Sequence, residues 1–174
     1  MSRNQFSTIP CPFPTNRAAV DAVDAVNRGV VAVRTQHQQL DQDERQLMDR
    51  AASGRELDAV KLLGDARDLR TRRLAVLLAE MEIMQLKEQA HRVVGDVAAQ
   101  LDAEATKELD AANAVLVATP AEQRGHLLPG RLALIGKLTG IRDQRANFRA
   151  ILDEDQWHAL QLRELIRATI AGEI

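Results

Sequence analysis

The fold can be inferred from residues 23–51, whose sequence is VDAVNRGVVAVRTQHQQLDQDERQLMDRA. Residues that suit a helix interface recur there at alternating intervals of three and four, the spacing of a helix that packs one face against a partner helix. Two members of this heptad row, His37 and Glu44, are polar. The row consists of Val23, Val26, Val30, Val33, His37, Leu40, Glu44, Leu47 and Ala51.

The flanking residues set the limits of this first helix. Thr15 or Asn16 offers an N-cap. At the other end Gly54 interrupts the pattern, and Ser53 with Glu56 fits the capping box that opens a second helix. We therefore expect a helix over about residues 17–52, a turn near 53–54, and a long second helix that ends before Pro120.

The second predicted helix carries two rows of apolar residues. Between residues 74 and 86 nearly every face is apolar, so further helices, from this chain or from another copy, must cover it. One row, the 60–84 row, has alternating spacing and consists of Val60, Leu63, Arg67, Arg70, Leu74, Leu77, Met81 and Met84. The other, the 62–97 row, repeats every seven residues and consists of Leu62, Leu69, Val76, Ile83, Ala90 and Val97.

A turn at Ser53–Gly54 predicts how the two helices face each other. In an antiparallel pair the numbers of two facing residues have a nearly constant sum, the register sum, which this turn sets at about 107. The 60–84 row then faces the first helix, with Val30 near Leu77. The result is an elongated antiparallel coiled-coil hairpin.

The same register brings polar residues of both helices together. Glu44 lies near Arg67, and His37 faces Arg70. We therefore predict a polar seam layer made of these four residues. A register-setting role is the ordinary interpretation of such residues, and a pH response of His37 is the alternative.

The first sixteen residues have a different character. Prolines at alternate positions in Ile9-Pro10-Cys11-Pro12-Phe13-Pro14 remove backbone donors and favour extended backbone, so an extended proline-rich arm is expected. Aromatic residues make up 2% of the chain, yet Phe6 and Phe13 lie here. We predict that Phe6, Ile9 and Phe13 dock on a partner; the alternative is that the arm folds over its own bundle.

The C-terminal part should complete a helical bundle. A third helix is expected over residues 132–152 and a last helix after Asp153, with apolar positions at Trp157, Leu160, Leu165 and Ile170. The third helix presents Leu134, Leu138, Ile141, Arg145, Phe148 and Leu152 on one face. The predicted fold is all-α, divided into an arm (1–16), a hairpin (17–118) and a C-terminal segment (119–174).

Few residues suggest chemistry. Glu88-x-x-His91 and Asp155-x-x-His158 have the spacing of metal ligands in di-metal bundles, although the predicted register places no first-helix carboxylate opposite His91. Cys11, the one cysteine, lies between prolines with no evident base nearby. No phosphate-binding loop, dinucleotide fingerprint or nucleophile elbow is present, so no cofactor is expected.

The arginines form two groups, at residues 67–73 and 142–149, but the net charge is −2 and acidic residues interleave. The N-terminus lacks the apolar run of a signal peptide, and no stretch has the roughly 20 apolar residues of a membrane span. A cytoplasmic or particle-associated protein is expected, without membrane or nucleic acid as partner.

These features predict a non-catalytic structural or adaptor protein. It would act through coiled-coil packing and a docking arm in an oligomeric assembly, as a homo-oligomer or with other protein subunits, and a virion or other particle is one natural setting. The first alternative is a nucleic-acid-binding regulator that uses the arginine rows. The second is a di-metal helical-bundle enzyme.

Overall fold

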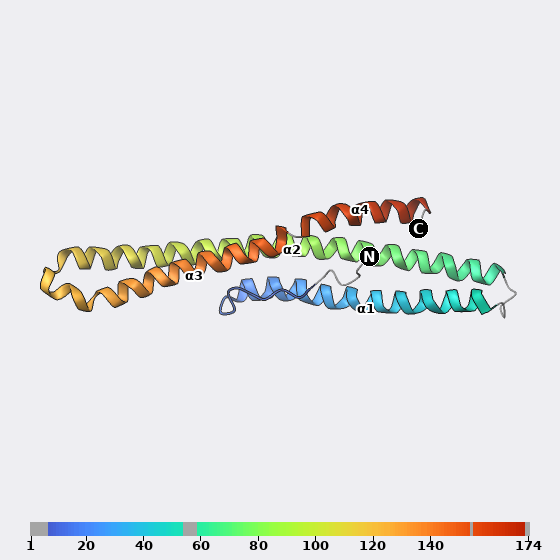
Figure 1. Ribbon diagram of the computed structural model, residues 1–174. Helices are drawn as coiled ribbons and strands as arrows, with labels where there is room; N and C mark the ends of the chain where they lie inside the picture. The colour runs from blue at the N-terminus through green and yellow to red at the C-terminus, as the bar shows by residue number, and fades with distance from the viewer. Residues whose placement is uncertain (1–6, 54–58, 154, 173–174) are drawn as a thin grey trace. The chain divides into compact units, whose positions relative to one another are not determined.

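The computed structural model describes residues 7–53, 59–153 and 155–172, apart from the side chains of 152–159. Its elements are helices that pack against one another, and the described residues contain no strand, so the all-α class is confirmed (Figure 1). The elements are α1 (Arg17–Ser53), α2 (Ala59–Ala118), the short 3-10 helix η1 (Ala121–His126), α3 (Leu128–Asp153) and α4 (Asp155–Ala171).

The helix ends follow local chemistry. Asn16 is the N-cap of α1, because its Oδ1 accepts a hydrogen bond from the backbone N–H of Ala19 at 3.2 Å. The α2 helix ends at Ala118, before Pro120, as expected. The α3 helix begins at Leu128 rather than at residue 132, since Pro129 has no N–H and is tolerated in a first helical turn.

The chain divides into two compact units. Unit 1 comprises residues 1–10, 23–88 and 154–174, and unit 2 comprises residues 11–22 and 89–153. Parts of α1 and α2 therefore belong to each unit. The boundaries of these units differ from those of the predicted arm, hairpin and C-terminal segment, and that division stays a prediction.

In unit 1, α1 buries the face that the heptad row predicts. Its apolar members from Val23 to Leu40 are at most 6% exposed. On α2, Val76, Leu77 and Ile83 are buried as well. The two helices come close at Gly29, where an added Cβ would lie 3.1 Å from Cγ1 of Ile83. Burial of these aliphatic side chains is the main source of stability in this unit.

The row that α4 buries is not made of the apolar positions named from the sequence. Leu162 and Thr169, seven residues apart, are buried at 5% and 1% exposure. Leu160, Leu165 and Ile170 are exposed, and the side chain of Trp157 lies outside the description. A step of five residues turns a helix by about 140°, so the predicted positions do not share a face, whereas positions seven apart do.

In unit 2, the C-terminal half of α2 packs antiparallel to α3 (Figure 1). Asn113 accepts a hydrogen bond from Arg131 at 2.7 Å, and Lys137 pairs with Glu108 at 2.9 Å. The predicted inner face of α3 is confirmed for its three central apolar members, while Arg145 is exposed. Those buried members are Leu138, Ile141 and Phe148.

Two neighbouring leucines test the packing of α2. Leu77 is 7% exposed and Leu78 is 48% exposed. We expect Leu77→Ala to lower the free energy of unfolding by about 2–5 kcal/mol, because it leaves a cavity in the core. The matched variant Leu78→Ala should cost less than about 1 kcal/mol. Urea denaturation measures both, and equal losses would contradict the assignment of the two faces.

Candidate functional site

The most distinctive feature of unit 1 is a set of charged side chains inside the α1–α2 interface. Nε2 of His37 contacts Oε1 of Glu80, and these side chains are 25% and 12% exposed. Two helical turns away, Nη2 of Arg73 lies 3.3 Å from Oε1 and 3.4 Å from Oε2 of Glu44. We call these two pairs the polar layers. Each layer places opposite charges, or a carboxylate and an imidazole, across the interface.

The polar layers contain His37 and Glu44 as predicted, but their partners on α2 are different. The predicted register paired them with Arg70 and Arg67, and this was wrong. Both observed pairs have a register sum of 117 rather than about 107. Asp43–Arg72 and Arg50–Asp65, both 2.6 Å apart, have a sum of 115 and support the same alignment.

The error came from choosing the wrong row of α2. The face of α2 turned toward α1 combines the 62–97 row with a second set of positions four residues further on, and the latter are charged at Arg73, Glu80 and Lys87. Glu80 and Lys87 are 9% and 4% exposed. A search for apolar residues does not select such a face, because its charged positions look like solvent-exposed positions. Recurrence of charge every seven residues was the available signal.

Arg70 has another role within unit 1. Its Nε and Nη2 donate hydrogen bonds to the carbonyl oxygen of Thr169 at 2.8 and 2.5 Å, and Nη2 also reaches the carbonyl of Ile170 at 3.2 Å. These carbonyls belong to the last turn of α4, where the helix has no backbone donors left to satisfy them. A cation at this end also interacts favourably with the helix dipole. The 60–84 row therefore faces α4 at Arg70.

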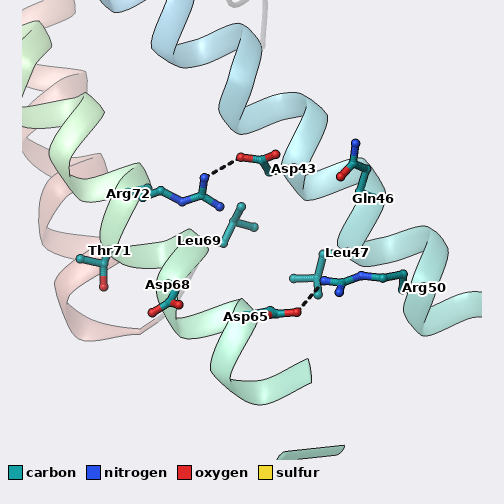
Figure 2. Close-up of a pocket in the computed structure, with 9 residues that line it drawn as sticks. All are labelled: Asp43, Gln46, Leu47, Arg50, Asp65, Asp68, Leu69, Thr71 and Arg72. Atoms are coloured by element: carbon teal, nitrogen blue, oxygen red, sulfur yellow. Dashed lines mark hydrogen bonds and ion pairs between the residues drawn. The ribbon is translucent and has the colours of Figure 1, made fainter. Parts of the chain in front are cut away.

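A cleft of about 630 Å³ lies between α1 and α2 beside the polar layers. Figure 2 shows that the ion pairs Asp43–Arg72 and Arg50–Asp65 span it from helix to helix, with Leu47 and Leu69 between them. Because these charges already bind one another, the charged groups that line the cleft are engaged within the chain. We interpret the cleft as part of the α1–α2 interface rather than as a ligand pocket.

The predicted docking residues of the arm are placed differently from one another. Phe6 lies outside the described residues. Ile9 and Phe13 are each 5% exposed, so both are buried by the chain itself. Asn27 fixes Ile9 from α1: its Oδ1 accepts from the backbone N–H at 2.8 Å and its Nδ2 donates to the carbonyl at 3.0 Å. This favours the alternative in which the arm belongs to its own bundle.

The remaining candidates have ordinary surroundings. Glu88 is exposed and His91 is half-buried on α2, while the side chains of Asp155 and His158 lie outside the description. Within the described residues no group of His, Cys, Asp and Glu side chains is arranged to hold a metal ion. Cys11 is a half-buried free thiol.

Comparison with protein-family models, curated proteins and solved structures found no match to this chain. In the part of the chain that the structure describes, none of the helices combines the length and the apolar character that crossing a membrane requires.

Arg70 and Arg67 form a matched pair for testing the α4 cap. Arg67 is exposed one turn earlier on α2, and within the described residues its guanidinium makes no hydrogen bond. We expect Arg70→Ala to cost about 1 kcal/mol locally, which corresponds to roughly fivefold faster hydrogen exchange in the last turns of α4. Arg67→Ala should leave that exchange unchanged. An equal response to both substitutions would show that the capping bonds do not hold α4.

The arm is tested by deleting residues 1–14. This removes buried Ile9 and Phe13 together with the hydrogen bonds to Asn27, so we expect a melting temperature lower by roughly 5–15 °C. Calorimetry measures the shift, and Thr8→Ala, at an exposed position, is the control that should leave it unchanged. An unaltered melting temperature with loss of self-association would instead support the docking role.

Proposed function

We propose that this chain is a non-catalytic structural or adaptor protein that works through helix packing in a homo-oligomeric assembly. The observation behind the proposal is a group of exposed apolar side chains where α2 ends and α3 begins in unit 2, which we call the apolar tip. It consists of Val115, Val117, Leu128 and Leu132, which are 55%, 75%, 43% and 62% exposed. Val115 and Val117 are two residues apart and point to different sides of α2, so the tip is several exposed apolar side chains at one end of a helix pair, which favours a contact there.

The charges beside the apolar tip favour a protein partner over a polyanion. Arg124 donates to the carbonyl oxygens of Thr119 at 2.8 Å and Val117 at 3.4 Å. Arg131 donates to Asn113 at 2.7 Å. These guanidinium groups are bound to their own chain and help to close the end of the hairpin. The exposed aliphatic side chains of the tip suit the aliphatic surface of a second copy.

The nucleic-acid alternative depends on the two arginine groups, and most of their members have internal partners. Arg72, Arg73 and Arg70 bind Asp43, Glu44 and the end of α4. In the second group, Arg142 forms two hydrogen bonds to Asp102, at 2.7 and 3.3 Å. That hydrogen bonding, with a smaller coulombic contribution, lowers the pKa of Asp102 below its ordinary value. Arginines held this way are poorly placed for phosphates.

The buried state of Ile9 and Phe13 moves the proposed contact from the arm to the apolar tip. An arm that is held by Asn27 would have to detach before it could dock on a neighbour, and its burial would be lost. The tip needs no such change. Its exposed aliphatic surface is accessible in unit 2 as the unit stands.

Self-association and its dependence on Val117 test this proposal. We expect the protein to form oligomers at micromolar concentration, and Val117→Asp to weaken association at least about tenfold, because a carboxylate buried at a contact is costly. Val31→Asp changes another exposed valine, at 55% exposure on α1, and should leave association intact. Sedimentation equilibrium measures all three proteins. A strictly monomeric native chain, or equal effects of the two substitutions, would contradict the proposal.

A further inference from the structure

The apolar residues of the α1–α2 interface fit more than one alignment. Leu40 and Val76 line one cavity, and Leu47 and Leu69 line another, so each pair meets across the interface. Since α2 repeats its apolar positions every seven residues, sliding it by one heptad, about 10 Å along its axis, places Leu40 opposite Leu69 or Ile83. The apolar contacts would be renewed after either slip. Apolar burial alone therefore leaves three alignments open.

The charged positions separate these alignments. At a register sum of 110, His37 would face Arg73, and Val30 would face the Glu80 carboxylate. At a sum of 124, Glu44 would face Glu80, and His37 would face Lys87. Val30 faces a charged residue in the observed alignment too, where Lys87 lies opposite it, so the difference lies in the like charges that each slip would bring together, which is unfavourable inside an interface.

The two outer ion pairs discriminate in the same direction. After the first slip Asp43 would face Asp65, and after the second Arg50 would face Arg72. In the observed alignment these four residues form the two 2.6 Å pairs across the cleft. The side chains of the outer pairs are 27–53% exposed and those of Arg73 and Glu44 are 31% and 35% exposed, so solvent weakens all three pairs relative to His37–Glu80, at 25% and 12%.

We infer that His37–Glu80 and Glu44–Arg73 are a register lock, whose role is to select one of three alignments in which Leu40 and Leu47 keep apolar partners on α2. The inference is independent of the proposed function, because it concerns unit 1 and does not involve the apolar tip. It also gives a physical reason for placing charges inside a helix interface, where apolar residues would pack as well.

Cysteine cross-linking in a Cys11→Ser background reports the alignment. Gln39 and Ala75 line the same cavity, so cysteines there should be joined by a short thiol reagent in the observed register. Cysteines at Gln39 and Asp68 report the first slip, and those at Gln39 and Glu82 report the second. None of these four positions belongs to the polar layers or the outer pairs. The native chain should link only the Gln39–Ala75 pair.

Three variants of the full chain test the register lock. The charge exchange Glu44→Arg with Arg73→Glu should keep the native link. Replacing all four polar-layer residues by leucine should leave the chain helical and spread linking over the three reporter pairs. The decisive variant combines Ala66→Arg, Arg73→Glu and Glu80→Val, which provides complementary partners for Glu44, His37 and Val30 only after the first slip.

For the decisive variant we expect most of the linked product to move from Gln39–Ala75 to Gln39–Asp68. A native link that persists alone in this variant would overturn the inference, as would loss of the native link in the charge exchange. If the leucine variant aggregates, the decisive variant still gives the answer, because it retains buried charges with partners. Circular dichroism confirms that each variant remains helical.

Discussion

The requirement that a buried charge has a partner determines much of unit 1. Glu80 is 9% exposed inside a largely aliphatic interface, and its carboxylate has to meet a proton donor or a cation there. His37 meets that need in one alignment of α1 and α2. Once this alignment is set, the positions of Glu44 and Arg73 follow from the heptad spacing. Arg70 then lies on another face of α2, where it can receive α4. Packing of apolar side chains supplies the stability, and the charges decide which packing is used.

The long α2 helix has a different partner on each of its faces. In unit 1, one face packs on α1 through Val76 and Ile83, and another meets the end of α4 at Arg70. In unit 2, the continuation of α2 pairs with α3. An excess of apolar residues between positions 74 and 86 is thus consistent with packing inside one chain. It does not by itself require a second copy, so the case for assembly depends on the apolar tip.

Helix positions and the inner faces of α1 and α3 could be predicted from sequence, but the inner faces of α2 and α4 and the pairing of helices could not. The α1 boundaries, its Asn16 cap and the inner face of α3 follow from local chemistry and from spacing, which act within one helix. Register is a relation between two helices, and here it depends on Glu80 and Arg73, which look like surface residues when α2 is considered alone. The Asn27 contact with Ile9 was equally hidden, because nothing in a helical asparagine marks it as a partner for a distant backbone.

The register lock also predicts how substitutions in the polar layers affect the stability of unit 1 and its choice of alignment. Replacement of a polar layer by leucine would remove a desolvation cost and could raise the free energy of unfolding, while the number of competing alignments would increase. The free energy of unfolding would then rise while the preference for a single alignment falls. An interface built from repeated aliphatic positions needs some asymmetry to have one best alignment, and large aromatic side chains often provide it. With aromatics at 2% of the chain, charge supplies much of that asymmetry here, beside the close approach of Ile83 to Gly29. The charges in the α1–α2 interface therefore do part of the work that large aromatic side chains do in other interfaces, which is to favour one alignment.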